Sequence, residues 1–139
     1  IVKGKPVYMS PEQATGDRVD RRSDLFSMGL ILYESLVGER CFKRADDTRT
    51  MEAIVRDALP PRPDLIAPPM WEVVKRALQK APEDRYRTAA DMARALVDVA
   101  VPVSDAELGR LVWQRFPAQY EDCARWDKVA DQVPPGAKG

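Results

Sequence analysis

The chain contains no histidine and only two cysteines, Cys41 and Cys123, among its 139 residues. Histidine imidazoles and cysteine thiolates are the usual ligands of zinc, and these two cysteines match no metal-motif spacing. We therefore expect no metal site in this chain. We interpret both cysteines as free thiols of a reducing compartment, which predicts a cytoplasmic protein.

An excess of one charge is also absent, because 22 Lys and Arg residues balance 22 Asp and Glu residues. Such a balance gives no indication of binding to nucleic acid or to an anionic membrane surface. The sequence has no apolar run of about 18 residues and no basic-then-apolar leader. We expect neither a nucleic-acid partner nor a membrane segment here. The chain starts at Ile1 without a methionine, which suggests a piece of a longer polypeptide.

The strongest feature that is present is an apolar stretch at residues 24–37. Apolar side chains occur at nearly every position from Leu25 to Leu32, and a helix that is apolar all round is typical of a protein interior. Ser23 is a candidate N-cap, and Gly38 suits the left-handed residue that ends a helix. This rod of roughly 20 Å is too short to span a bilayer. The stretch therefore predicts a buried central helix.

The rest of the chain predicts further helices joined by irregular segments. Residues 1–13 are expected to be extended or looped, and half of residues 60–69 are proline, which indicates a stiff connector. Capping-box patterns begin at Thr88 and Ser104. Apolar residues at helical spacing predict helices at about 48–59, 69–81, 88–100 and 104–116, with a weaker one near 120–126. The polar residues 131–139 are expected to be disordered.

Three motifs give the chain a family resemblance. Residues 10–12 read Ser-Pro-Glu where the family has Ala-Pro-Glu, and residues 24–29 read Asp-Leu-Phe-Ser-Met-Gly where it has Asp-x-x-Ser-x-Gly. Residues 82–88 are similar to the turn near the end of the family's domain that contains a characteristic arginine. In this order, over about residues 1–100, they resemble a bacterial, eukaryotic-like Ser/Thr protein kinase from the end of its activation segment onward.

The resemblance implies an all-α fold, a truncated kinase C-lobe of five to six helices around the central helix at about 24–37. On that basis residues 1–101 are a partial protein kinase domain. Residues 102–130 form a C-terminal helical extension, and residues 131–139 form a disordered tail.

The resemblance also implies that the intact kinase uses ATP and Mg²⁺, which phosphoryl transfer requires. The chain has no Gly-rich loop, no Val-Ala-Ile-Lys-like strand, no His-Arg-Asp and no Asp-Phe-Gly. We expect no catalytic residue and no cofactor in this chain. Whether the chain by itself is an enzyme therefore stays open. Its expected partners are a protein substrate and the kinase N-lobe with its catalytic loop.

By the same resemblance, the segment of Lys5, Val7, Tyr8, Met9 and Ser10 forms a shelf for the substrate residue that follows the phosphoacceptor. The alternative is that Tyr8 and Met9 are simply packed apolar residues. Lys5 departs from the family, in which many members carry a threonine that bonds the catalytic aspartate.

Three charged residues are implied to be structural. In the family, the glutamate matching Glu12 pairs with the arginine matching Arg85, and a planar guanidinium suits a buried carboxylate. The alternative is two separate surface charges. In the family, the aspartate matching Asp24 holds the catalytic loop. Without the family, the simplest interpretation is an acidic residue that the helix dipole favours at a helix N-terminus.

Two other functional readings remain at this stage. A degenerate or truncated kinase could serve as a non-catalytic helical scaffold or protein-binding module. An unrelated helical interaction domain would require the order of the three motifs to be chance.

Overall fold

The computed structural model describes residues 6–100 and 103–117, and every regular element within these ranges is helical. The predicted all-α fold of five to six helices is confirmed for this part of the chain. The elements are η1 (Pro6–Tyr8), α1 (Pro11–Thr15), α2 (Arg22–Val37), α3 (Asp47–Arg56), α4 (Pro68–Ala77), η2 (Pro82–Asp84), α5 (Ala89–Val99) and α6 (Asp105–Arg115). The chain divides into two compact units, residues 1–101 and 102–139.

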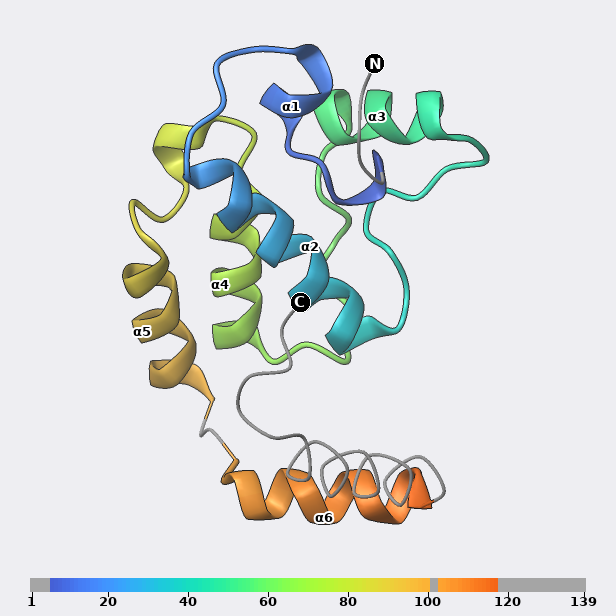
Figure 1. Ribbon diagram of the computed structural model, residues 1–139. Coiled ribbons are helices and arrows are strands. Elements are labelled where there is room, and N and C mark those ends of the chain that lie inside the picture. Colours follow the sequence, from blue (N-terminus) through green and yellow to red (C-terminus); the bar gives the residue numbers. More distant parts are fainter. Residues whose placement is uncertain (1–5, 101–102, 118–139) are drawn as a thin grey trace, which may run out of the picture. The chain divides into compact units, whose positions relative to one another are not determined.

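Helix α2 occupies the centre of the first unit (Figure 1). Helix α4 packs against α2 and α5 packs against α4, while η1 and α1 pack against α3. Phe26, Leu30 and Tyr33 of α2 are buried in one cluster with Ile54 of α3 and Val74 of α4. Full burial of one such side chain contributes about 1.5–3 kcal/mol, so this cluster is the main source of stability of the unit.

A second cluster lies on the other side of the α2–α4 contact. It joins Leu25 of α2 to Val73 and Ala77 of α4, and to Tyr86 and Met92 on the α5 side. Helix α4 is therefore apolar on both sides, toward α2 and toward α5.

One face of α2 is open to solvent within this unit. Asp24, Met28, Ile31 and Ser35 recur at helical spacing, and all four are exposed. Met28 is 51% exposed and Ile31 45% exposed, although both are large apolar residues. The sequence pattern predicted burial around the whole helix, and the structure corrects this for the Asp24–Ser35 stripe, because no described element covers it.

The start of α2 is also corrected. Arg21 is the N-cap residue and supplies no capping side chain, and Gly38 ends the helix at a φ of 81° as expected. The Asp20 carboxylate accepts a hydrogen bond from the Arg22 amide at 2.8 Å. Ser23 does not cap the helix, because it lies inside the first turn and its hydroxyl points to Glu12.

The segment before α2 is more regular than the sequence suggested. Residues 1–13 were expected to be extended or looped, but they include η1 and the first residues of α1. Ser10 and Gln13 form a capping box, in which the Ser10 amide donates to Gln13 Oε1 at 2.9 Å. Pro11 starts α1 at a position where a missing N–H costs nothing.

The described part of the second unit is α6. Its N-terminus is the predicted capping box, with the Ser104 amide donating to Glu107 Oε2 at 2.9 Å. Leu108, Leu111 and Trp113 are exposed on it, and so is Phe116, the residue that follows it. The remaining expectations for residues 118–130 and 131–139, together with Cys123, lie outside the described residues.

Candidate functional site

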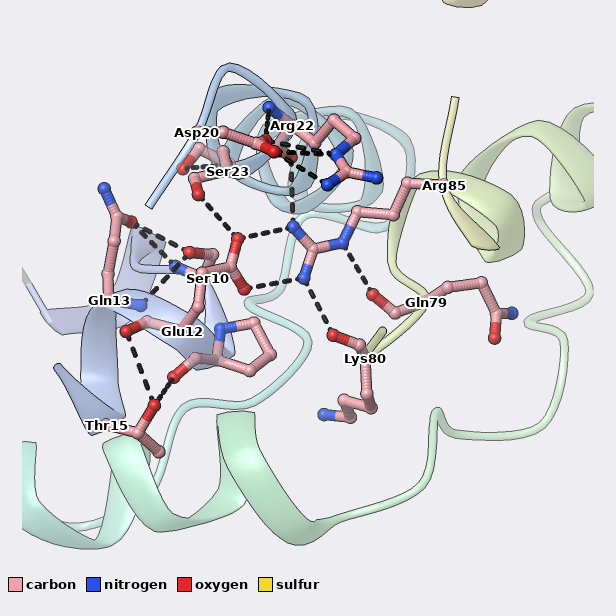
Figure 2. A network of polar contacts seen from close by, with 12 residues as sticks. Ser10, Glu12, Gln13, Thr15, Asp20, Arg22, Ser23, Gln79, Lys80 and Arg85 are labelled. Carbon is pink, nitrogen blue, oxygen red and sulfur yellow. Dashed lines mark hydrogen bonds and ion pairs between the residues drawn. The ribbon is translucent and has the colours of Figure 1, made fainter. Parts of the chain in front are cut away.

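The site is centred on an ion pair between Glu12 in α1 and Arg85, the residue that follows η2 (Figure 2). Arg85 Nη1 lies 2.7 Å from Glu12 Oε1, and Arg85 Nη2 lies 2.7 Å from Glu12 Oε2. The Arg85 side chain is 0% exposed and that of Glu12 is 8% exposed. This is a bidentate, buried guanidinium–carboxylate pair, the geometry in which arginine binds a carboxylate best.

Arg85 also donates to three main-chain carbonyls. Its Nε donates to the Gln79 carbonyl at 2.8 Å, Nη1 to the Arg22 carbonyl at 3.0 Å and Nη2 to the Lys80 carbonyl at 2.9 Å. With the two bonds to Glu12, all five N–H groups of the guanidinium are used. One side chain thus connects α1, the first turn of α2 and the turn after α4, as Figure 2 shows.

The Glu12 carboxylate accepts a further hydrogen bond, from the start of α2. The Ser23 hydroxyl donates to Glu12 Oε1 at 2.5 Å, and Arg85 Cζ lies 4.9 Å from the centroid of the Phe26 ring. Among the described residues, no buried side-chain nitrogen or oxygen lacks a hydrogen-bond partner. The good geometry and the complete hydrogen bonding of this pair offset the cost of desolvating its two charges.

The environment of Glu12 changes its acidity. Burial by itself raises the pKa of Glu12, but hydrogen bonds from Arg85 and Ser23 outweigh it and lower the pKa from 4.5 to about 2. Glu12 is therefore a carboxylate at every physiological pH, and the pair stays charged.

This shift predicts a pH dependence of stability. Because the pKa of Glu12 is about 2 in the folded chain and near 4.3 when unfolded, its contribution is complete above pH ~5 and is lost as the pH falls toward ~2. The full effect is about 3 kcal/mol. Urea unfolding of the 139-residue chain from pH 7 to pH 2.5 should therefore show a stability gap between wild type and Glu12→Gln that closes on acidification. Parallel curves would contradict this assignment, and the comparison with Glu12→Gln cancels the titration of Asp20.

Tyr8 is anchored to α2 at two points. Ser27 Oγ donates to the Tyr8 carbonyl at 2.7 Å, and the Tyr8 hydroxyl donates to Glu34 Oε2 at 2.8 Å. The Arg40 guanidinium lies 5.6 Å from the centroid of the Tyr8 ring. The Tyr8 side chain packs against the core cluster, so its position is fixed by the helix beneath it.

The other residues of the expected substrate shelf differ in accessibility. Val7 and Met9 are half-buried, whereas the Ser10 side chain is fully buried and caps α1. Lys5 lies outside the described residues. Val7 and Met9 therefore keep accessible surface, and Ser10 and Tyr8 hold the segment in place.

Asp24 stands apart from this network. It is exposed in the first turn of α2 and makes no side-chain hydrogen bond to the described residues. The structure thus brings Glu12 and Arg85 together and leaves Asp24 on the open face of α2.

Several contributors to the site carry no recognisable signal in the sequence. Gln79, Lys80 and Arg22 take part only through their main-chain carbonyls, which any residue would supply. Ser23 contributes its side chain, but its sequence position indicated a helix cap. Ser27 belongs to the Asp-x-x-Ser-x-Gly motif, which was the one signal that could have identified it.

Three further properties of the described residues concern metal ions, membranes and the free thiol. The described residues contain no group of three or more histidine, cysteine, aspartate or glutamate side chains able to hold a metal ion. No helix in the described ranges is both long enough and apolar enough to cross a membrane. Cys41 is a free, half-buried thiol, and burial raises its pKa to about 11, so it stays protonated at neutral pH.

Comparison with known proteins gives a match to one family. The family model described as the protein kinase domain matches residues 1–96. The chain is 46% identical over 101 residues to the serine/threonine-protein kinase PknB of Mycobacterium tuberculosis, which covers 70% of this chain and 16% of PknB.

Two proteins of Myxococcus xanthus are also similar. The tyrosine-protein kinase MasK is 44% identical over 100 residues, which is 69% of this chain and 15% of MasK. The serine/threonine-protein kinase Pkn1 is 37% identical over 101 residues, which is 69% of this chain and 14% of Pkn1. The chain thus spans only about one seventh to one sixth of the length of these relatives.

Proposed function

Because the chain belongs to the protein kinase domain family, matched over residues 1–96, we propose that it is the C-lobe part of a bacterial protein serine/threonine kinase. In that enzyme it anchors the end of the activation segment and presents the substrate shelf. The observation that carries this proposal is the buried bidentate pair of Glu12 and Arg85. It ties the segment containing Val7 and Met9 to the helical core.

The anchor matters because phosphoryl transfer depends mainly on positioning and electrostatics. A displacement of about 1 Å in a substrate-positioning element costs on the order of a hundredfold in rate. Tyr8 is held at its carbonyl by Ser27 and at its hydroxyl by Glu34. This double attachment fixes Val7 and Met9 on either side of it, where they would contact the substrate residue after the phosphoacceptor.

ATP and Mg²⁺ serve the reaction in the protein kinase family, in which the metal ions neutralise charge on the transferred phosphoryl group. The described residues of this chain offer no cluster of side chains able to hold the Mg²⁺ ions. The role proposed here is therefore confined to binding and orienting the protein substrate. Its phosphoacceptor is a serine or threonine hydroxyl, as the names of PknB and Pkn1 suggest.

A chimaeric kinase tests this role. Residues 1–101 would replace the matching segment of PknB, and kcat/KM would be measured for two peptides that differ only in the residue after the phosphoacceptor. Val7→Ala or Met9→Ala should change the ratio of the two kcat/KM values about tenfold, because a lost apolar contact changes discrimination by 10-fold or more. Val97→Ala is the control, since Val97 is 59% exposed on α5.

The ratio separates substrate contact from general damage. A variant that merely destabilises the chimaera lowers both rates together and leaves the ratio unchanged. An unchanged ratio in both shelf variants would remove the proposed contact. A folded chimaera without any phosphoryl transfer would instead support a non-catalytic kinase-like scaffold.

A further inference from the structure

An arginine-rich cleft lies beside the Glu12–Arg85 anchor. It has a volume of about 530 Å³ and is lined by Asp20, Arg21, Arg22 and Arg87. The first three residues lead into α2, and Arg87 follows the anchor arginine by two positions. Figure 2 shows Asp20 and Arg22 at this end of α2, next to Arg85.

The two walls of the cleft are fixed relative to each other. Arg21 Nε donates to the Arg87 carbonyl at 3.3 Å, and Arg85 Nη1 donates to the Arg22 carbonyl at 3.0 Å. Both contacts are between side chain and main chain, so they leave the outer guanidinium groups available. The segment after η2 therefore contributes both Arg85 of the anchor and Arg87 of the cleft, and its contacts with the start of α2 fix the shape of the cleft.

The lining carries an excess of positive charge, with three arginines and one aspartate. The aspartate is already neutralised, because Arg22 Nε and Nη2 donate to Asp20 Oδ2 at 3.0 and 2.7 Å. Hydrogen bonds from Arg22 lower the pKa of Asp20 to about 2, so it remains a carboxylate. Glu83 is near enough to favour the charged form of Arg22, but it does not line the cleft.

Two of the arginines have no carboxylate partner among the described residues. Arg21 and Arg87 are exposed, and neither takes part in an ion pair there. Toward the described residues, Arg21 uses only its Nε as a donor, so both of its Nη groups stay free to bind a ligand. The Arg87 side chain makes no hydrogen bond within the described ranges. Planar guanidinium groups are well suited to bind the oxygens of a phosphate dianion.

We propose that Arg21, Arg22 and Arg87 bind the phosphoryl group of a phosphorylated serine or threonine in a protein segment. A phosphomonoester carries close to two negative charges at neutral pH, which equals the excess charge of the lining. A single carboxylate would leave one arginine uncompensated. The choice of a phosphorylated protein as the ligand rests on the proposed kinase function, whose product carries this group.

The charge distribution argues against a nucleic acid. Nucleic-acid surfaces are usually basic patches or stripes on a basic domain, whereas this chain has no net charge and the cleft is a local cluster. A bound phosphoryl group would bridge the start of α2 to the turn after η2. It would thereby add a third link between the two segments that Arg85 and Arg21 already join.

Fluorescence anisotropy with the full 139-residue chain tests the proposal. The probes are a labelled peptide with one phosphothreonine, the same peptide without phosphate, and inorganic phosphate as competitor. The phosphopeptide should bind at least about tenfold more tightly than the unmodified peptide, as expected for charge-assisted hydrogen bonds. Added salt should weaken its binding.

Arg87→Ala is the decisive variant, because it removes a side chain with no hydrogen bond in the described part and keeps the carbonyl that Arg21 uses. It should weaken phosphopeptide binding about tenfold with an unchanged melting temperature. Arg21→Ala should have a similar effect on binding. Arg94→Ala is the matched control, an exposed arginine paired with Asp91 on α5, and should bind as wild type does.

Three results with the peptides would overturn the proposal, and a fourth concerns free phosphate. The three are equal binding of the two peptides, equal loss of binding in Arg94→Ala, and full affinity retained by Arg87→Ala. Inorganic phosphate that binds as tightly as the phosphopeptide would identify free phosphate as the ligand and would also overturn it. The assay contains neither ATP nor a turnover step. A negative result here therefore leaves the outcome of the chimaeric kinase test unaffected.

Discussion

Alanine at Glu12 or at Arg85 should each lower the free energy of unfolding of the 139-residue chain by about 3–5 kcal/mol. Each single change leaves one buried charge without its partner, and the two side chains are 8% and 0% exposed. The double variant should cost clearly less than the sum of the two, since it removes both charges. The coupling energy from urea unfolding at pH 7 should be roughly 1–3 kcal/mol.

The control cycle uses Glu72 and Lys75, an ion pair on α4 at 2.7 Å whose side chains are 65% and 44% exposed. Its coupling should stay below about 1 kcal/mol, because water screens an exposed pair. If a single alanine variant of the anchor fails to fold, Glu12→Gln and Arg85→Lys give a milder cycle of the same design. Additive effects of the anchor variants, within about 0.5 kcal/mol, would show that the pair does not act as a unit.

Substitution of Gly29 should be the second large effect. A Cβ at this position would lie 2.9 Å from Ala77 Cβ and 3.0 Å from Leu78 Cδ2, so α4 must move to admit it. Overpacking of this kind costs about 1–3 kcal/mol. The gain in helix propensity from glycine to alanine recovers at most about 1 kcal/mol. We expect Gly29→Ala to destabilise the chain in urea unfolding, and Gly29→Val to do so more strongly.

Two companion variants isolate the steric cause. Ala77→Gly should reduce the cost of Gly29→Ala when the two are combined, because it removes the atom nearest to the new Cβ. Gly109→Ala on α6 meets no atom within 4 Å and should raise helicity, a change of opposite sign worth about 0.5–1 kcal/mol. A neutral or stabilising Gly29→Ala would mean that α2 and α4 do not approach each other so closely.

The same contact gives a physical reason for one position of the family motif. Gly29 is the glycine of Asp-x-x-Ser-x-Gly, and its φ is not in the left-handed region. Glycine is therefore needed at this position because it lets α2 and α4 approach closely, and not because of its backbone freedom. Gly38 is the contrasting case, since its φ of 81° lies in the left-handed region that favours glycine.

Local patterns were sufficient for the longer helices, α2 to α6, and for most of their ends. Ser104 and Glu107 form the expected capping box, and Thr88 accepts a hydrogen bond from the Asp91 amide at 3.1 Å. Caps and helical periodicity depend on residues three or four apart, so the sequence contains them directly. The short helix α1 was missed although Ser10, Pro11 and Gln13 were all present, because the prolines were interpreted only as helix breakers.

Periodicity did not determine how much of each helix is covered. The open stripe of α2 contains Met28 and Ile31, which are as apolar as the buried Leu25 and Leu30. Trp71 of α4 is 8% exposed and lies 6.4 Å from Tyr33 between ring centroids, a contact between two helices that no spacing within α4 predicts. Which face is buried depends on the neighbouring elements, and those come from distant parts of the chain.

The sequence by itself determined the helices α2 to α6, the N-caps of α5 and α6 and, through three ordered motifs, the likeness to a kinase C-lobe. The family resemblance implied that Glu12 pairs with Arg85, but only the tertiary structure decided the geometry of this pair and the further donors around it. Arg85 lies 73 residues away from Glu12 in the sequence. Ser23, which the sequence suggested as a helix cap, donates to the same carboxylate. The physical reason is that a buried carboxylate must be hydrogen-bonded by whatever donors the packed helices bring to it, and no local spacing encodes which donors those are.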